Sequence, residues 1–166
     1  MIKINFFSTL NYTKMQGTKN LIKQIDETYT EQGKQLIIDF FMTFSRLEYA
    51  LKSAGFLIEK KNSVSPDWSK FAKSIEKNFD KDYSQSVRNS VNYILENPPK
   101  IQVVSFDILA WQDRTIQENE PIIQRLKSHI CDIRNNLFHG GKFDGGFEPE
   151  ISRNYLLLEH SLIILN

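Results

Sequence analysis

A long amphipathic helix is the feature that most constrains what this chain can fold into. Between about Glu31 and Gly55, apolar residues recur at spacings of three and four, namely Ile37, Phe40, Phe44, Leu47, Leu51 and Ala54. That period places them on one face of a helix, and a face of this length must be buried against other elements. Gly55 is predicted to end the helix, because glycine accepts the left-handed conformation common at helix C-termini.

Four further segments show the same helical period. Ser65 and Pro66 resemble a helix cap followed by a proline in the first turn, which predicts a helix through Trp68, Phe71 and Ile75. Helices are also predicted over about 81–96, 118–139 and 151–165, with the prolines at 98–99 and the glycines at 140–141 ending the first two. Residues 101–113 fit neither the helix nor the strand period and are interpreted as a packed connection. The predicted fold is therefore all-α, a bundle of about five to six helices.

The domain organisation and compartment follow from length and composition. A chain of 166 residues suits one domain, predicted here over 31–166 and preceded by an N-terminal tail, 1–30, with a short helix or an extended piece. We expect an intracellular, cytoplasmic protein without membrane contact, because no signal peptide pattern or spanning apolar run is visible. The single cysteine, Cys131, excludes an internal disulfide and is interpreted as a small core residue.

The charge balance limits how the chain can hold nucleic acid. Lysine and arginine total 21 against 20 acidic residues, which gives a net charge of +1, so any contact with RNA or DNA must come from a local patch. His129 and His160 have no partners at metal-ligand spacing and are interpreted as structural. We therefore predict no metal site and no cofactor.

The most distinctive string is "CDIRNNLFHGGKF", residues 131–143. On a helix, Ser128, Asp132, Asn135 and His139 form a polar stripe opposite the apolar face, with Arg134 on a flank. One interpretation is a solvated stripe whose histidine caps the helix end. The other is that a second copy covers the stripe across a two-fold axis, which gathers arginine, asparagine and histidine from both chains. Such a cluster has the acid–base and phosphate-binding groups for cleaving RNA without a metal.

These residues resemble the HEPN superfamily. "RNNLFHGGK" is similar to its signature of arginine, four to six residues, then histidine, and the glycines and lysine resemble the Apea-like branch. "FFMTFSRLEYALKSAGF" and "NPPK", at 40–56 and 97–100, also fit that pattern. The resemblance implies a helical bundle that dimerises through the motif helix, and an activity as a metal-independent endoribonuclease used as a toxin or in antiviral defence. It also implies an antitoxin partner of nucleotidyltransferase type.

The resemblance implies a role for each motif residue. Arg134 would bind or stabilise the scissile phosphate, Asn135 would orient the phosphate or the histidine, and His139 would carry out the acid–base chemistry. Asp132 and Lys142 are assigned supporting positions beside them. Glu48 is predicted to support the site by pairing with Arg134, or else to form a surface pair with Lys52. The alternative function is a non-catalytic HEPN-like module that binds a nucleotide or a protein partner.

Overall fold

A computed structural model of the chain describes residues 30–138 and 151–166. The chain divides into two units, Met1–Gln35 and Leu36–Asn166. In the first unit only residues 30–35 are described, and there the Thr30 hydroxyl accepts a hydrogen bond from Gly33 N at 3.1 Å. The predicted tail, short helix or extended piece over 1–30 lies outside the described residues, apart from its last position.

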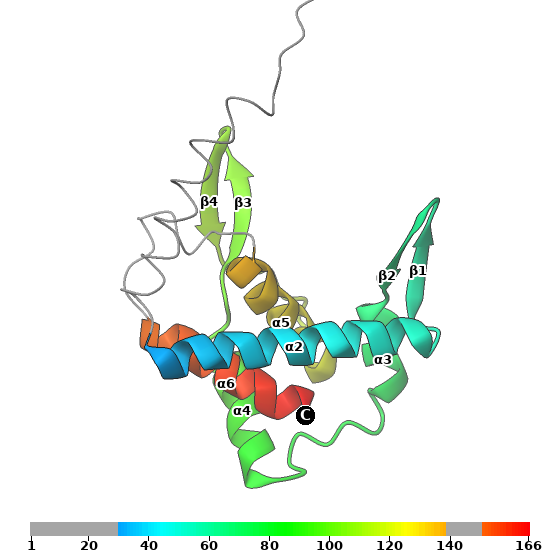
Figure 1. Ribbon diagram of the computed structural model, residues 1–166, viewed down its shortest axis with the longest axis horizontal. Helices are drawn as coiled ribbons and strands as arrows, with labels where there is room; N and C mark the ends of the chain where they lie inside the picture. Colours follow the sequence, from blue (N-terminus) through cyan, green and yellow to red (C-terminus); the bar gives the residue numbers. More distant parts are fainter. Residues whose placement is uncertain (1–29, 139–150) are drawn as a thin grey trace, which may run out of the picture. The chain divides into compact units, whose positions relative to one another are not determined.

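The described chain is mixed α and β, so the all-α prediction is wrong (Figure 1). The described helices are α2 (Glu31–Ser53), α3 (Trp68–Ile75), α4 (Gln85–Glu96), α5 (Ile122–Phe138) and α6 (Ile151–Leu165). Two antiparallel hairpins add β1 (Leu57–Lys60) with β2 (Ser63–Pro66), and β3 (Ile101–Ser105) with β4 (Ile108–Gln112). The number of described helices agrees with the five to six predicted.

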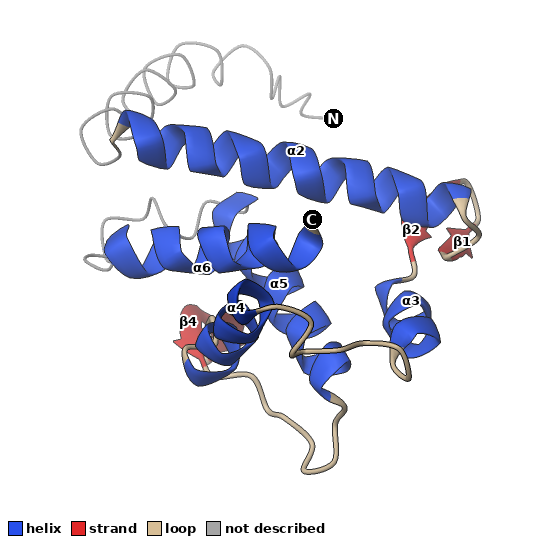
Figure 2. Ribbon diagram, turned by 90° about the horizontal axis from the view of Figure 1, so that it is seen from below, coloured by secondary structure: helices blue, strands red, loops and turns tan. Residues whose placement is uncertain are grey.

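The core of the second unit lies between the helices. From Leu36 onward, α2 runs alongside α6, while α4 and α5 pass beneath this pair (Figure 2). The buried apolar side chains of the four helices form one cluster, made of Phe40, Phe44, Val91, Ile94, Leu126, Ile130, Ile133, Leu137, Leu157 and Leu158. Buried area of this kind is the main stabilising contribution in a helical core. None of the described helices is long and apolar enough to span a membrane.

The end of α2 is as the sequence predicts. Gly55 has φ of +84°, its N–H donates to the carbonyl of Lys52 at 3.1 Å, and Phe56 N–H donates to the carbonyl of Leu51 at 2.9 Å. These two bonds make a Schellman motif, which satisfies carbonyls that the helix leaves unpaired. Glycine is needed at position 55 because side chains rarely adopt that φ. The chain leaves the helix here and enters β1.

The start of α3 differs from the prediction. Ser65 and Pro66 belong to β2, where they pair with Ile58 and Leu57, and the cap is Asp67, whose carboxylate accepts from Lys70 N at 2.9 Å. The proline closes a hairpin strand and does not open a helix. A serine before a proline is typical of both positions, so the sequence could not separate them.

The segment interpreted as a packed connection, 101–113, instead forms the second hairpin. Val104 pairs with Leu109 and Ser105 with Ile108, which leaves Phe106 and Asp107 as a two-residue turn. Their φ angles are +50° and +61°, the combination of a type I′ turn that matches the twist of a hairpin. Asparagine and glycine usually signal this turn, and neither occurs here, so the hairpin was missed.

Candidate functional site

Both ends of the β3–β4 hairpin are attached to one face of α5. After β4, Arg114 donates from Nε and Nη2 to the two carboxylate oxygens of Asp132, each at 2.6 Å. Before β3, the carbonyl of Lys100 accepts from Nδ2 of Asn136 at 2.7 Å. Asp132 and Asn136 are four residues apart and therefore lie on the same side of the helix. The hairpin stem is thus held against the helix that carries the motif.

This attachment changes the environment of the predicted polar stripe. Asp132 is only 4% exposed, because the hairpin stem and Arg114 cover it. Asn135, one turn further along, is exposed. The carboxylate of Asp132, which was assigned a supporting position, is bonded to Arg114 of the same chain. There it neutralises the guanidinium and anchors the hairpin. Asn135 remains at the surface.

Arg134 contacts groups of its own helix α5 and of α2, and α3 holds one of these groups in turn. Its Nη1 donates to Oδ1 of Asn135 at 2.9 Å, and its Nη2 lies 3.5 Å from Oε1 of Glu48 on α2. The guanidinium lies over the ring of Phe44 with 5.5 Å to the centroid, and the same Glu48 oxygen accepts from Trp68 Nε1 of α3 at 3.5 Å. Of the two pairings left open for Glu48, the structure contains the one with Arg134. These contacts fix the guanidinium while one third of the side chain stays exposed.

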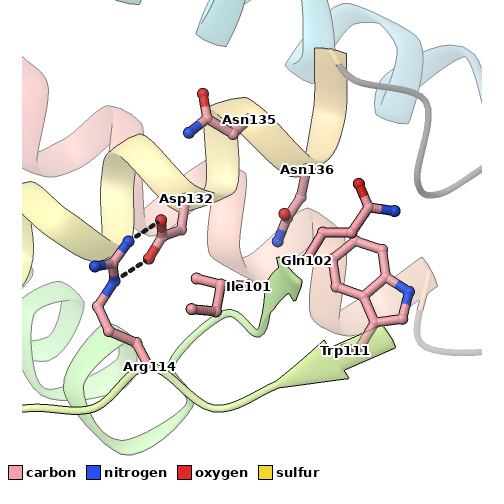
Figure 3. A pocket seen from close by; sticks show the side chains of 7 residues that line it. All are labelled: Ile101, Gln102, Trp111, Arg114, Asp132, Asn135 and Asn136. Carbon is pink, nitrogen blue, oxygen red and sulfur yellow. Dashed lines mark hydrogen bonds and ion pairs between the residues drawn. The ribbon is translucent and has the colours of Figure 1, made fainter. Parts of the chain in front are cut away.

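A hollow of about 330 Å³ lies between the hairpin stem and α5 (Figure 3). Its lining combines apolar, amide and charged groups: Ile101, Gln102, Trp111, Arg114, Asp132, Asn135 and Asn136. Asn135 is thus shared between the hollow and the hydrogen bond to Arg134. The hollow adjoins the motif and presents amide donors and acceptors beside it.

Two of the predicted site residues, His139 and Lys142, lie outside the described residues. The structure brings Arg134, Asn135 and Glu48 together, and it places Asp132 on the adjacent face of α5 with Arg114. The roles given to His139 and Lys142 stay predictions from the resemblance.

The residues that join the hairpin to α5 were not predicted from the sequence as site residues, apart from Asp132. Asn136 carried a usable signal, since it lies four residues after Asp132 in a polar run and shares its helix face. Arg114 carried none, because its partner is 18 residues away and a hairpin had not been predicted. Gln102 and Trp111 reach the hollow through that same hairpin.

His129 is a buried histidine without a hydrogen-bond partner among the described residues. It is 1% exposed, and neither ring nitrogen is bonded. Burial lowers the pKa of its imidazole, while the nearby carboxylate of Asp132 acts in the opposite direction. The side chain therefore serves as a neutral core residue. Within the ranges that the structure describes, no three His, Cys, Asp or Glu side chains gather as metal ligands.

His160 and Cys131 also have environments that favour their neutral forms. His160 Nδ1 lies 3.0 Å from the hydroxyl of Ser90, its ring stacks on Tyr93 with 4.4 Å between centroids, and burial lowers its pKa. Burial raises the pKa of the Cys131 thiol to about 11. A thiol with that pKa is a poor nucleophile at neutral pH, which agrees with its interpretation as a packing residue.

Comparisons of the chain with family models, curated proteins and solved structures gave no match. Membership of the HEPN superfamily therefore stays a prediction based on the residues of the motif.

Proposed function

We propose that the protein is a metal-independent endoribonuclease of HEPN type, with a composite site formed by Arg134, Asn135 and His139 of two copies. The observation that supports this most is the fixed and partly exposed guanidinium of Arg134, bonded to the adjacent Asn135. An arginine held by an amide, a carboxylate and an aromatic ring has lost much of its freedom, so binding a phosphate costs less ordering entropy. The resemblance adds the role of toxin or defence enzyme.

The proposed reaction is transfer of the phosphoryl group within RNA. The ribose 2′-oxygen attacks the neighbouring phosphorus, the bond to the 5′-oxygen breaks, and the products are a 2′,3′-cyclic phosphate and a 5′-hydroxyl. Histidine serves as the acid–base group, since its ordinary pKa allows both forms near neutrality. Arginine stabilises the charge that develops on the phosphorane oxygens.

The contacts of Arg134 are compatible with a phosphate ligand. A guanidinium has five N–H donors, and the bonds to Asn135 and Glu48 leave others for an incoming oxygen. The separation of 3.5 Å from Glu48 is longer than that of a charge-assisted hydrogen bond, about 2.7–2.9 Å, so this ion pair leaves N–H donors of the guanidinium available to a phosphate. Glu48 acts in this proposal as a positioning residue that keeps the fork over Phe44.

The test is cleavage of end-labelled RNAs of mixed sequence in the presence of EDTA. Wild type, Arg134→Ala and His139→Ala are compared, with folding checked by circular dichroism. The matched control is Arg88→Ala, which removes an exposed arginine on α4 that pairs with Asp82 at 2.7 Å. We expect wild type and Arg88→Ala to produce 2′,3′-cyclic ends, and the two motif variants to lose roughly 100-fold or more of the rate.

Two results would decide against the proposal. If folded wild type leaves all the RNAs intact, the non-catalytic binding module becomes the better function. If His139→Ala cleaves as well as wild type, the activity belongs to another site or to a contaminant.

A further inference from the structure

The distal half of the β3–β4 hairpin exposes large apolar side chains, with Val104 and Leu109 paired on one face, Ile108 on the other and Phe106 in the turn. Four large side chains are exposed there: Val104 by 70%, Phe106 by 97%, Ile108 by 69% and Leu109 by 62%. The hairpin extends away from the helices in Figure 1. We call Val104, Phe106, Ile108 and Leu109 the arm. Large apolar side chains exposed close together mark an interaction surface more often than a solvated one.

The backbone of the arm is paired on one side of each strand only. Within the described residues the β3–β4 sheet has only two strands, so each strand is an edge with unpaired N–H and C=O groups. A two-stranded hairpin is marginally stable in water, and an uncovered apolar edge tends to pair with another chain. The turn further lowers the stability of the isolated hairpin, because Phe106 adopts a φ of +50°, which is unfavourable for bulky residues.

The charge of the arm indicates what kind of partner fits it. Residues 101–112 contain one charged side chain, Asp107, and no lysine or arginine. RNA or an anionic membrane would need cations at this surface, which the segment lacks. A surface that is nearly uncharged is compatible with a copy of itself, since an isologous contact brings identical groups together without like-charge repulsion.

The size and position of the arm also suit a second copy. The face with Val104 and Leu109, together with Phe106 in the turn, offers roughly 400 Å² per chain, against about 800 Å² per partner in a stable interface of standard size. The remaining area has an obvious source in the exposed surface around Asn135, because Asp132 and Asn136 tie the hairpin stem to the same helix. An interface on the arm would therefore continue to the motif.

We propose that the arm is the apolar part of a homodimer interface, in which the hairpin of one copy packs against its counterpart beside the motif helices. The proposal rests on the proposed function for the two-fold pairing of the motif and names the surface that holds the two copies together. The hydrogen bonds of Arg114 and Asn136 at the hairpin stem hold the arm in a fixed position relative to α5.

Sedimentation equilibrium of the full chain tests the arm directly. Val104→Lys places a charge in the arm, and Val64→Lys makes the same substitution in β2, where the valine is 54% exposed and faces Glu59 across the hairpin. Phe106→Ser provides a second arm variant that adds no charge. We expect a wild-type dimer, a dissociation constant raised at least about tenfold in both arm variants, and no change in Val64→Lys.

Three results would overturn the proposal. The first is a wild type that stays monomeric at the highest concentration reached, and the second is unchanged dimerisation in both folded arm variants. The third is an arm variant that loses RNA binding while its dimer stays intact. Cleavage assays on the same samples keep the two proposals separate. A dimer that depends on the arm but cleaves no RNA supports the arm and contradicts the ribonuclease. Cleavage by a monomeric wild type contradicts both the arm and the two-copy composition of the site, while leaving the ribonuclease activity itself in place.

Discussion

Arg114 and Asp132 form a bidentate ion pair in which one partner is far more buried than the other. Both bonds are 2.6 Å long, yet the side chain of Asp132 is 5% exposed and that of Arg114 is 36% exposed. The pair joins the segment after β4 to the middle of α5. A carboxylate so deeply buried depends on its partner, because a charge removed from water and left unpaired is costly.

Removing the arginine from this pair is therefore expected to destabilise the fold. We predict that Arg114→Ala lowers the free energy of unfolding by about 2–3 kcal/mol, since it leaves the Asp132 carboxylate without a partner. Urea unfolding measures the change, and the double variant Arg114→Ala with Asp132→Ala is expected to recover part of the loss.

An exposed ion pair provides the control for that experiment. Arg88 and Asp82 also lie 2.7 Å apart, but their side chains are 48% and 44% exposed, so Arg88→Ala should cost under about 1 kcal/mol. Equal losses in the two arginine variants would show that burial of Asp132 does not determine the energy of the Arg114 pair.

The helices were predictable from sequence and the hairpins were not. The period of α2 and the glycine at 55 specify a helix and its end through contacts close in the chain, and the structure agrees. The hairpins depend on turns that lack the usual glycine, and on strands without alternation: Val104, Ile108 and Leu109 are all exposed and lie on both faces. A strand pattern is readable only where one face is buried and the other is solvated.

The candidate site was predictable to the same extent. The pairing of Glu48 with Arg134 was one of two alternatives that the two predicted helices left open, the other being Lys52. The burial of Asp132 was not predictable, because Arg114, which covers it, follows a hairpin that the sequence does not predict. A residue's helix face can be inferred from local spacing, whereas its cover depends on distant chain segments.

The stability of the fold should fall as the solution becomes acidic. Burial lowers the pKa of both His129 and His160 below the ordinary value of 6.5. Below pH 6.5 the unfolded chain binds more protons at these positions than the folded chain does, so the free energy of unfolding decreases with falling pH, by up to about 1.4 kcal/mol per pH unit for the buried His129 and by less for the partly exposed His160.

His129→Leu separates the contribution of His129 from that of other groups. Urea unfolding at pH 7.5 and at pH 5 is expected to show a smaller difference between the two conditions for the variant than for wild type. Leucine suits the site because both ring nitrogens of His129 lack partners among the described residues. An identical difference in the two proteins would show that His129 is charged, or equally accessible to protons, in the folded state.

Cys131 should react slowly with alkylating reagents in the native protein. A pKa of about 11 in place of 9.0 reduces the thiolate fraction at pH 8 by roughly 100-fold, and burial restricts access further. Alkylation by iodoacetamide, followed by mass spectrometry, is expected to be at least that much slower in buffer than in denaturant. Comparable rates would indicate an exposed and ionised thiol, and would contradict the packing around α5.

Phe106→Gly should have opposite effects on the single chain and on the dimer. Glycine removes the cost of a φ of +50°, which is about 1–2 kcal/mol for a side chain, although part of the gain is lost to the larger entropy of the unfolded chain. We predict that the free energy of unfolding rises by about 0.5–1 kcal/mol in a dilute, monomeric sample. The same change removes the most exposed side chain of the arm, so the concentration dependence of the urea midpoint should shrink.

Lys61→Gly is the matched control, because Lys61 has a φ of +41° in the turn of the other hairpin. That variant should gain stability and keep the full concentration dependence of the urea midpoint. A loss of this dependence in both variants would show that dimerisation does not depend on the arm in particular.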